Sequence, residues 1–299
     1  MKITRRVFVS MPGDKWLTPQ ENELKWAIVK TIEKLGYQAE IFFDPRGKSR
    51  RAGNEAWSGA AVERIAASCS AAAILGFPRW KSDALNFATE YCHYEAAIAH
   101  ALDLPLLVLV QDDVQKRVVF DRSFGGYIGT IPVGANTAWL RTPAFRTPFR
   151  YWKEELKKRR DLFLGYCSSS TPVAKKLKRL IQQRTGATVL DWQTDFSPGR
   201  SILAQVDEAS SRCSAGVFLF TRDDKLANGT RSTKAVPRDN VVFEAGYFIR
   251  AKGKDRVLIV REGGAKMPAD LGGDIYAALD ARRTMKSIEP ALVKFVAGL

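Results

Sequence analysis

The chain has 299 residues, of which 45% are apolar, so it is long enough for two ordinary domains that each bury a core. No stretch approaches the roughly 20 consecutive apolar residues of a membrane span, and the charged start Met1–Arg6 leads directly into a strand-like segment. We therefore expect a soluble, cytoplasmic protein without a membrane partner.

The formal net charge is +15. Residues 1–150 contain 20 basic and 15 acidic residues, and residues 151–299 contain 27 basic and 17 acidic residues. No basic stripe interleaved with aromatic side chains accompanies this excess, so the charge does not favour nucleic acid as a partner. Cys69, Cys92, Cys167 and Cys213 are far apart, form no CxxC pair and are accompanied by only two histidines. This pattern predicts small buried side chains and neither a disulfide framework nor a metal site.

Apolar periodicity predicts alternating strands and helices in the first half of the chain. In chain order, the predicted segments are strand Val7–Ser10, helix Asn22–Leu35, strand Ala39–Phe43, helix Ser58–Ala67, strand Ala71–Leu75, helix Phe87–Leu102 and strand Pro105–Val110. This alternation is typical of a parallel sheet with helices on both faces. We expect the first domain to span residues 1–140, followed by a basic linker over residues 141–160 that contains Lys157–Arg160.

The same pattern restarts after this stretch and predicts a second domain over residues 161–299. Its predicted segments are strand Leu162–Tyr166, helix Pro172–Arg184, strand Thr188–Asp191, helix Ser201–Ser211, strand Ala215–Thr221, helix Asp239–Ala251, strand Arg256–Val260 and helix Ile288–Ala297. The predicted fold is thus α/β, with two parallel-sheet, three-layer domains in tandem. In such sheets a ligand cleft is expected at the carboxyl ends of the strands.

One carboxylate, Glu244, lies inside an apolar run that should form a buried helix. Because burial of an unpaired carboxylate is costly, such a residue is either ion-paired at the edge of its helix or part of a functional cleft. Glu95 occupies a similar place before the strand of the first half that ends at Val110. This similarity reflects either a duplication or only the shared architecture.

Three polar loops follow the strands of the second half and face the same edge as Glu244: Cys167–Pro172, Trp192–Arg200 and Arg222–Asn240. The first offers hydroxyls and amides at a helix N-terminus, which suit a phosphate but also an ordinary helix start. The sequence has no Walker A or GxGxxG motif at a strand-to-helix junction, and no Ser or Cys nucleophile paired with histidine. A single carboxylate suits a reaction whose leaving group needs no proton, and the release of nicotinamide from NAD is such a reaction.

The second half contains several ordered blocks within about residues 161–280: Phe163–Gly165 with Ser168 and Ser169, Phe196–Ser201, Val217–Asp224, Pro237–Phe248 and Met267–Gly272. Together these blocks closely resemble a bacterial TIR-like family of NAD-hydrolase effectors in cyclic-nucleotide-signalled anti-phage defence. The resemblance implies a flavodoxin-like TIR fold and an NAD glycohydrolase that releases nicotinamide and linear or cyclic ADP-ribose. NAD is then the substrate, and no cofactor is implied.

The resemblance also implies roles for individual residues. Glu244 matches the catalytic glutamate of the family. The implied substrate-binding residues are Gly165, Ser168, Ser169, Asp195, Phe196, Arg200, Asp239 and Asn240. Activation by self-assembly into a homo-oligomer, when a cyclic nucleotide signal is bound, is implied as well.

The first half resembles another TIR-like or nucleoside deoxyribosyltransferase-like module, and we interpret it as a sensing or assembly domain. A possible ligand site there comprises Ser10, Asp44 and Glu95. Two alternatives to an NAD hydrolase remain open from the sequence. The pair of domains could be a non-catalytic module that binds a nucleotide or assembles, or the first half could transfer deoxyribosyl groups through Glu95.

Overall fold

The chain forms two compact units in a computed structural model that describes residues 2–82, 85–227, 233–268 and 276–299. One unit consists of Thr4–Arg159 and is called the N-terminal unit below. The other, the C-terminal unit, consists of Arg160–Leu299 together with the first residues up to Ile3. Each unit is an α/β domain with its own five-stranded sheet, as the alternating pattern predicts.

The sheet of the N-terminal unit is parallel throughout, with the order β2-β1-β3-β6-β7. Its strands are β1 (Arg6–Ser10), β2 (Gln38–Glu40), β3 (Ala71–Gly76), β6 (Leu106–Gln111) and β7 (Tyr127–Ile131). A short antiparallel hairpin, β4 (Trp80–Lys81) with β5 (Asn86–Phe87), follows β3. All residues of β1, β3 and β6 are buried, which explains their nearly continuous apolar sequences.

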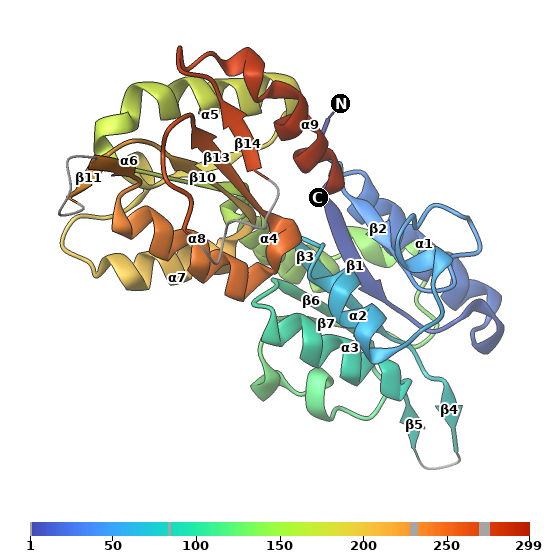
Figure 1. The fold of residues 1–299 in the computed structure, drawn as a ribbon. Helices are drawn as coiled ribbons and strands as arrows, with labels where there is room; N and C mark the ends of the chain where they lie inside the picture. Colours follow the sequence, from blue (N-terminus) through green and yellow to red (C-terminus); the bar gives the residue numbers. More distant parts are fainter. Residues whose placement is uncertain (1, 83–84, 228–232, 269–275) are drawn as a thin grey trace. The chain divides into compact units, whose positions relative to one another are not determined.

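Helices cover both faces of this sheet (Figure 1). On one face lie α1 (Pro19–Glu33) and α4 (Pro143–Lys158), and on the other lie α2 (Gly59–Ala66) and α3 (Glu90–Ala101). Helix α1 begins with a capping box in which Thr18 and Glu21 bond to each other's backbone amides.

The predicted basic linker over residues 141–160 is wrong, because most of it forms helix α4. The apolar side of α4 buries Phe145, Trp152 and Leu156 in the core, and the indole of Trp152 donates a hydrogen bond to the carbonyl of Pro105 at 3.0 Å. Helix α4 packs closely on β7 at Gly129, which has no side chain. A Cβ at this position would lie 3.2 Å from the carbonyl oxygen of Ala144. The boundary between the units therefore falls after α4, at Arg159.

The sheet of the C-terminal unit is also parallel, with the order β14-β13-β10-β8-β9. Its strands are β8 (Arg160–Tyr166), β9 (Val189–Asp191), β10 (Cys213–Phe220), β13 (Val257–Glu262) and β14 (Tyr276–Leu279). Counted from the start of each unit, both sheets have the strand order 2-1-3-4-5, which is the flavodoxin-like order.

Helices α5 (Thr171–Thr185) and α9 (Glu289–Gly298) pack on one face of this second sheet. Helices α7 (Ile202–Arg212) and α8 (Asp239–Lys252) pack on the other (Figure 1). A single helical turn, α6 (Trp192–Asp195), follows β9, and a hairpin of β11 (Asp224–Ala227) and β12 (Thr233–Val236) precedes α8. Side chains of β8 and β10 alternate between the two cores, so every second strand residue faces the aromatic cluster beneath α8.

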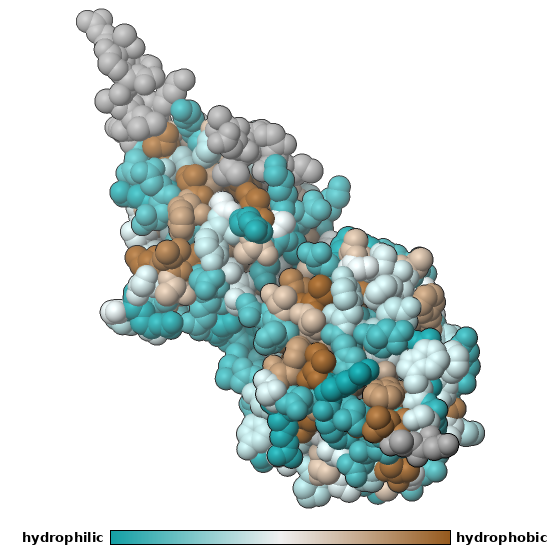
Figure 2. All heavy atoms as spheres, turned by 90° about the horizontal axis from the view of Figure 1, so that it is seen from below, coloured by the Kyte–Doolittle hydropathy of each residue, from teal (hydrophilic) through white to brown (hydrophobic). Residues whose placement is uncertain are grey.

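The prediction of two parallel-sheet domains in tandem is confirmed, whereas β7, β14 and the two hairpins were not predicted. All four cysteines are buried and free, in agreement with their predicted packing role. Within the described residues, no helix combines the length and apolar character needed to cross a membrane. On the face shown in Figure 2, exposed apolar side chains form several separate groups among polar ones.

Candidate active site of the C-terminal unit

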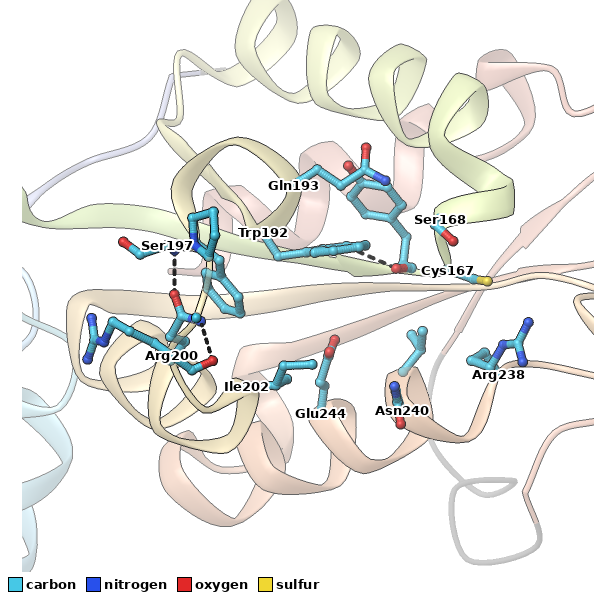
Figure 3. Close-up of a pocket in the computed structure, with 16 residues that line it drawn as sticks. Cys167, Ser168, Trp192, Gln193, Ser197, Arg200, Ile202, Arg238, Asn240 and Glu244 are labelled. Carbon is cyan, nitrogen blue, oxygen red and sulfur yellow. Dashed lines mark hydrogen bonds between the residues drawn. The ribbon is translucent and has the colours of Figure 1, made fainter.

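A cavity of about 780 Å³ opens at the carboxyl ends of β8 and β9. One side is formed by the end of β8 and the start of α8, and the other by the segment that connects β9 to α7. Figure 3 shows Glu244 on α8 pointing toward the indole of Trp192 across the cavity, with Asn240 at the start of the same helix. This is the edge at which ligands bind in open parallel sheets.

Glu244 is the acid of this cavity, and it is nearly completely buried, with 8% of its surface exposed. Its Oε2 atom has no hydrogen-bond partner among the described residues, and none of the ion pairs found there includes Glu244. Burial alone raises the pKa of this carboxyl group from its ordinary 4.5 to about 7. The structure thus removes the alternative of an ion-paired glutamate at the helix edge.

The residues around Glu244 explain its burial. Phe163, Phe218 and Phe248 pack against one another beneath α8, with ring centroids 5.0 to 5.8 Å apart. Gly165 of β8 leaves room for the carboxylate, because a Cβ there would lie 2.8 Å from Glu244 Oε2 and 2.5 Å from the Phe218 ring. The carboxyl group of Glu244 therefore lies between this aromatic cluster and the open cavity.

The segment Phe196–Arg200 forms the wall that faces α8. Buried Gln205 fixes this wall, since its Oε1 accepts a hydrogen bond from the amide of Ser197 at 2.6 Å and its Nε2 donates to the carbonyl of Arg200 at 3.4 Å (Figure 3). Phe196 stacks on Phe163 with ring centroids 6.0 Å apart. The wall is thus anchored to the same aromatic cluster that buries Glu244.

Two arginines and a helix N-terminus make the cavity rim suitable for anions. Arg200 pairs with Glu208 at 2.9 Å and Arg238 pairs with Asp224 at 3.3 Å, and both arginine side chains are about half exposed. Ser168 lines the cavity and begins the short turn Ser168–Ser170, which leads into α5, a 15-residue helix. Unpaired backbone amides and the helix dipole favour a phosphate group at such a position.

Five of the sequence-predicted residues line the cavity: Ser168, Phe196, Arg200, Asn240 and Glu244. Gly165 lies behind it and contacts Glu244 through its backbone. Asp239 is exposed in the first turn of α8 and does not line the cavity. Of the block Met267–Gly272 in the resemblance, Ala269–Gly272 lies outside the described residues.

The remaining two predicted residues, Ser169 and Asp195, serve local structure instead. Ser169 Oγ lies within hydrogen-bond distance of Asp223 at 2.9 Å and of the sulfur of Cys167 at 3.2 Å, and it donates its proton to one of them. Asp195 Oδ2 accepts a hydrogen bond from the amide of Asp191 at 2.7 Å and so closes the turn α6. Short polar side chains in loops commonly satisfy nearby backbone groups in this way.

Trp192 and Arg238 line the cavity and lie in loops that were predicted to face Glu244, although neither was named as a site residue, and Gln205 was not predicted at all. Trp192 directly follows β9, and its indole donates a hydrogen bond to the carbonyl of Tyr166 at 3.0 Å. Its position after a strand was an available signal for a site residue. The role of Gln205 depends on the path of a loop and has no sequence signal.

The residues proposed for an N-terminal ligand site are only partly brought together. Ser10 and Glu95 line a separate cavity of that unit. Asp44 does not line it, because its carboxylate accepts hydrogen bonds from Arg46 at 3.0 Å and from Ser49 at 2.9 Å. These bonds hold the pKa of Asp44 below its ordinary value in spite of partial burial.

Residues 161–281 match the family described as "CAP12/Pycsar effector protein, TIR domain". A CD-NTase-associated protein 12 of a Lachnospiraceae bacterium is 32% identical over 131 residues, which is 44% of this chain and 40% of that protein. The Pycsar effector protein BcPycTIR of Burkholderia cepacia is 28% identical over 114 residues, or 38% of this chain and 37% of that protein.

A third relative, the uncharacterized protein YuaY of Escherichia coli, is 37% identical over 82 residues, which is 27% of each chain. The chain thus spans less than half the length of each of these three curated relatives. The matched family and the flavodoxin-like strand order agree with the resemblance seen in the sequence. The C-terminal unit is thus a TIR-like domain that is similar, over residues 161–281, to the TIR domain of CAP12/Pycsar effector proteins.

Proposed function

We propose that the C-terminal unit is an NAD glycohydrolase that splits the bond between nicotinamide and ribose, with Glu244 as its catalytic carboxylate. The observation that carries this proposal is the unpartnered Oε2 of a buried glutamate at an open cavity. A carboxylate without a partner in an apolar setting is costly for the folded protein, so its retention at a cavity supports a functional role.

The reaction needs little more than stabilisation of a cation. As the bond between C1′ and the pyridinium nitrogen breaks, its electron pair leaves with nicotinamide, which departs as a neutral molecule. Positive charge develops on the ribose, and ionised Glu244 stabilises that charge in surroundings where screening by water is weak. Water then adds to C1′ and releases a proton, which gives ADP-ribose.

The rest of the cavity supports a dinucleotide substrate. The N-terminal end of α5 beside Ser168 and the guanidinium of Arg238 offer donors and positive charge for a pyrophosphate. Trp192 offers an aromatic face for a ring of the substrate. The volume of about 780 Å³ lies within the usual range of roughly 300–1,000 Å³ for small-molecule sites.

We further propose that this activity serves anti-phage defence and that a nucleotide signal and self-assembly switch it on. Support comes from the printed names of the relatives, which refer to CD-NTases and to Pycsar effectors. Ile202 lines the cavity although it is 60% exposed, and Phe243 on α8 is 55% exposed. Apolar side chains in such positions are suited to cover by a second copy of the chain.

The test is nicotinamide release from NAD by the purified full chain at high protein concentration, with and without a panel of cyclic mono- and dinucleotides. We expect turnover under at least one condition and a loss of at least 100-fold in Glu244→Gln, which keeps the shape but not the charge. Glu289→Gln is the matched control, because Glu289 pairs with Arg184 on the opposite face of the sheet.

Release by Glu244→Gln at the parent rate would refute the assignment of this residue. If no condition gives turnover while NAD still binds, the non-catalytic alternative replaces the proposal.

A further inference from the structure

The N-terminal unit has a cavity of its own, with a volume of about 680 Å³. It is lined by the carboxyl ends of β1 and β2, the segment between β1 and α1, and the first turns of α3. This cavity thus lies at the carboxyl ends of the strands of its sheet, and the candidate active site lies at the same edge of the sheet in the other unit.

The two cavities share a buried glutamate at matching places in the two folds. Glu95 lies on α3, between the third and fourth strands of its unit, and Glu244 lies on α8, between the third and fourth strands of the other. Glu95 is 5% exposed, and burial raises its pKa to about 7 although Ser10 and Trp57 oppose the rise. The N-terminal unit therefore maintains a costly buried acid at a cavity as well.

The floor of this cavity offers one acceptor and one hydroxyl. Glu95 Oε1 accepts a hydrogen bond from the indole nitrogen of Trp57 at 2.7 Å. Ser10, at the end of β1, is 2% exposed, and its hydroxyl lies close enough to Glu95 to lower the pKa of that carboxyl group. A hydroxyl and a carboxylate that lie together at a cavity wall can both bond to a polar group of a ligand.

The walls of the cavity are aromatic. The ring of Trp57 lies 4.5 Å from that of Tyr91, and Trp16 and Trp26 line other parts of the cavity. Trp16 is 39% exposed and Tyr91 is 40% exposed, so these rings present faces that the core does not use. Exposed aromatic faces at a concave site are suited to stacking on a planar ring of a ligand.

A guanidinium lies beside these rings. Arg79 is half-buried and lies 5.1 Å from the ring centre of Trp16 and 5.8 Å from that of Tyr91. It donates one hydrogen bond to Thr89 at 3.2 Å, its Nε is buried without a partner, and it forms no ion pair within the described residues. Glu90 interacts with Arg79 electrostatically but forms no salt bridge with it among the described residues, so the guanidinium keeps donors that suit a phosphate.

The other charges of the cavity leave a small positive excess. Asp14 lines the cavity, but buried Lys25 neutralises it at 2.5 Å and also donates to the carbonyl of Pro12 at 3.0 Å. The remaining charged groups of the lining are the basic Lys15 and Arg79 and the acidic Glu95. The balance fits a ligand with one phosphate better than one with several.

We propose that this cavity is a second ligand site and that it binds a mononucleotide, with the base against the aromatic walls, the phosphate at Arg79 and ribose hydroxyls at Glu95 and Ser10. This site has three lining tryptophans, Trp16, Trp26 and Trp57, and its acid already accepts a hydrogen bond from an indole N–H group, whereas Glu244 of the proposed NAD site accepts none among the described residues. The proposal concerns binding alone and does not depend on NAD cleavage by the C-terminal unit.

The experiment is titration calorimetry of the full chain with 5′-AMP, 5′-UMP and their 3′,5′-cyclic forms. Adenosine and ribose 5-phosphate are the reference probes, since each lacks one of the two main anchors. We expect at least one monophosphate to bind with a dissociation constant in the micromolar range, and both reference probes to bind at least tenfold more weakly.

Arg79→Gln should weaken monophosphate binding at least tenfold and leave adenosine binding unchanged, which a general loss of folding would not do. Glu244→Gln is the control for the other cavity and should leave all the affinities unchanged. The absence of monophosphate binding up to millimolar concentration would overturn the proposal. Binding that is lost in Glu244→Gln but kept in Arg79→Gln would also overturn it, because the ligand would then occupy the C-terminal cavity.

Discussion

Replacement of Glu244 by Gln should stabilise the C-terminal unit, and the gain should depend on pH. The pKa of Glu244 is raised from 4.5 to about 7 by burial. Between these two values the folded state binds more protons than the unfolded state, so stability falls as the pH rises through this window. Gln carries no charge at any pH, so the stability of the Glu244→Gln variant does not fall in this way as the pH rises through the window.

The size of the effect follows from the shift in pKa. A shift of this size costs the folded state about 3 kcal/mol at pH 8 but only about 1 kcal/mol at pH 5, where the unfolded state has begun to take up its proton. The Gln amide adds a cost of its own, but that cost is the same at both values of pH. The stability gain of the variant should therefore be about 2 kcal/mol larger at pH 8 than at pH 5.

Scanning calorimetry of the full chain at pH 5 and pH 8 measures this difference. For a domain of this size it corresponds to an extra rise of roughly 4–8 °C in the melting temperature of the C-terminal unit at pH 8. Asp239→Asn removes an exposed carboxylate from the same helix and should show no such pH-dependent gain. An equal gain for Glu244→Gln at both values of pH would refute the claim that this carboxyl group titrates near 7.

Three further predictions concern activity and packing. If ionised Glu244 is the catalytic form, kcat/KM for NAD should rise about tenfold per pH unit below 7 and level off above it, and a profile that falls over this range would contradict the assignment. Gly165→Ala should destabilise the protein by about 1–3 kcal/mol, measured by urea unfolding, because its methyl group would meet the Phe218 ring at 2.5 Å. Trp152→Ala should cost the N-terminal unit about 3–5 kcal/mol in the same assay, whereas a basic linker would tolerate the change.

The alternating pattern of the sequence predicted the central strands and their helices because these strands are buried on both faces. Strands such as Leu106–Gln111 then consist almost entirely of apolar residues and are easily recognised. Strand β7 contains Gly129 and Thr130 and has partly exposed positions, so its sequence resembles a loop. Edge strands are short and half-exposed, and their pairing depends on neighbours that the local sequence does not specify.

Helix α4 was misread because its charge and its prolines outweigh its apolar side in the sequence. Lys157 and Lys158 pair with glutamates three residues earlier on the exposed side. Pro148 lies inside the helix, where proline is normally unfavourable. The packing of Trp152 and Phe145 against the sheet supplies the stabilisation that the local sequence does not reveal.

For the site, the sequence singled out Glu244 because its charge conflicts with its apolar surroundings. Whether that charge was paired could not be predicted, since pairing depends on which side chains reach it in three dimensions. Ser169 and Asp195 show the reverse case, because their types suit a binding site but their oxygens are used by neighbouring groups. Residue type restricts the possible chemistry, and the hydrogen-bond partners decide which residues remain available for it.

The two buried glutamates show how one architecture can support two different uses of a carboxylate. At Glu244 no donor stabilises the charge, so a cation that develops nearby gains the full interaction with it. At Glu95 the indole of Trp57 already donates to one oxygen, which lowers the energy of the ionised form and fixes the group in place. The first arrangement favours stabilisation of a transition state, and the second favours recognition of a ligand that arrives with its own hydroxyl donors. This contrast in hydrogen bonding, within one strand order, is why we propose catalysis for the C-terminal unit and ligand binding for the N-terminal unit.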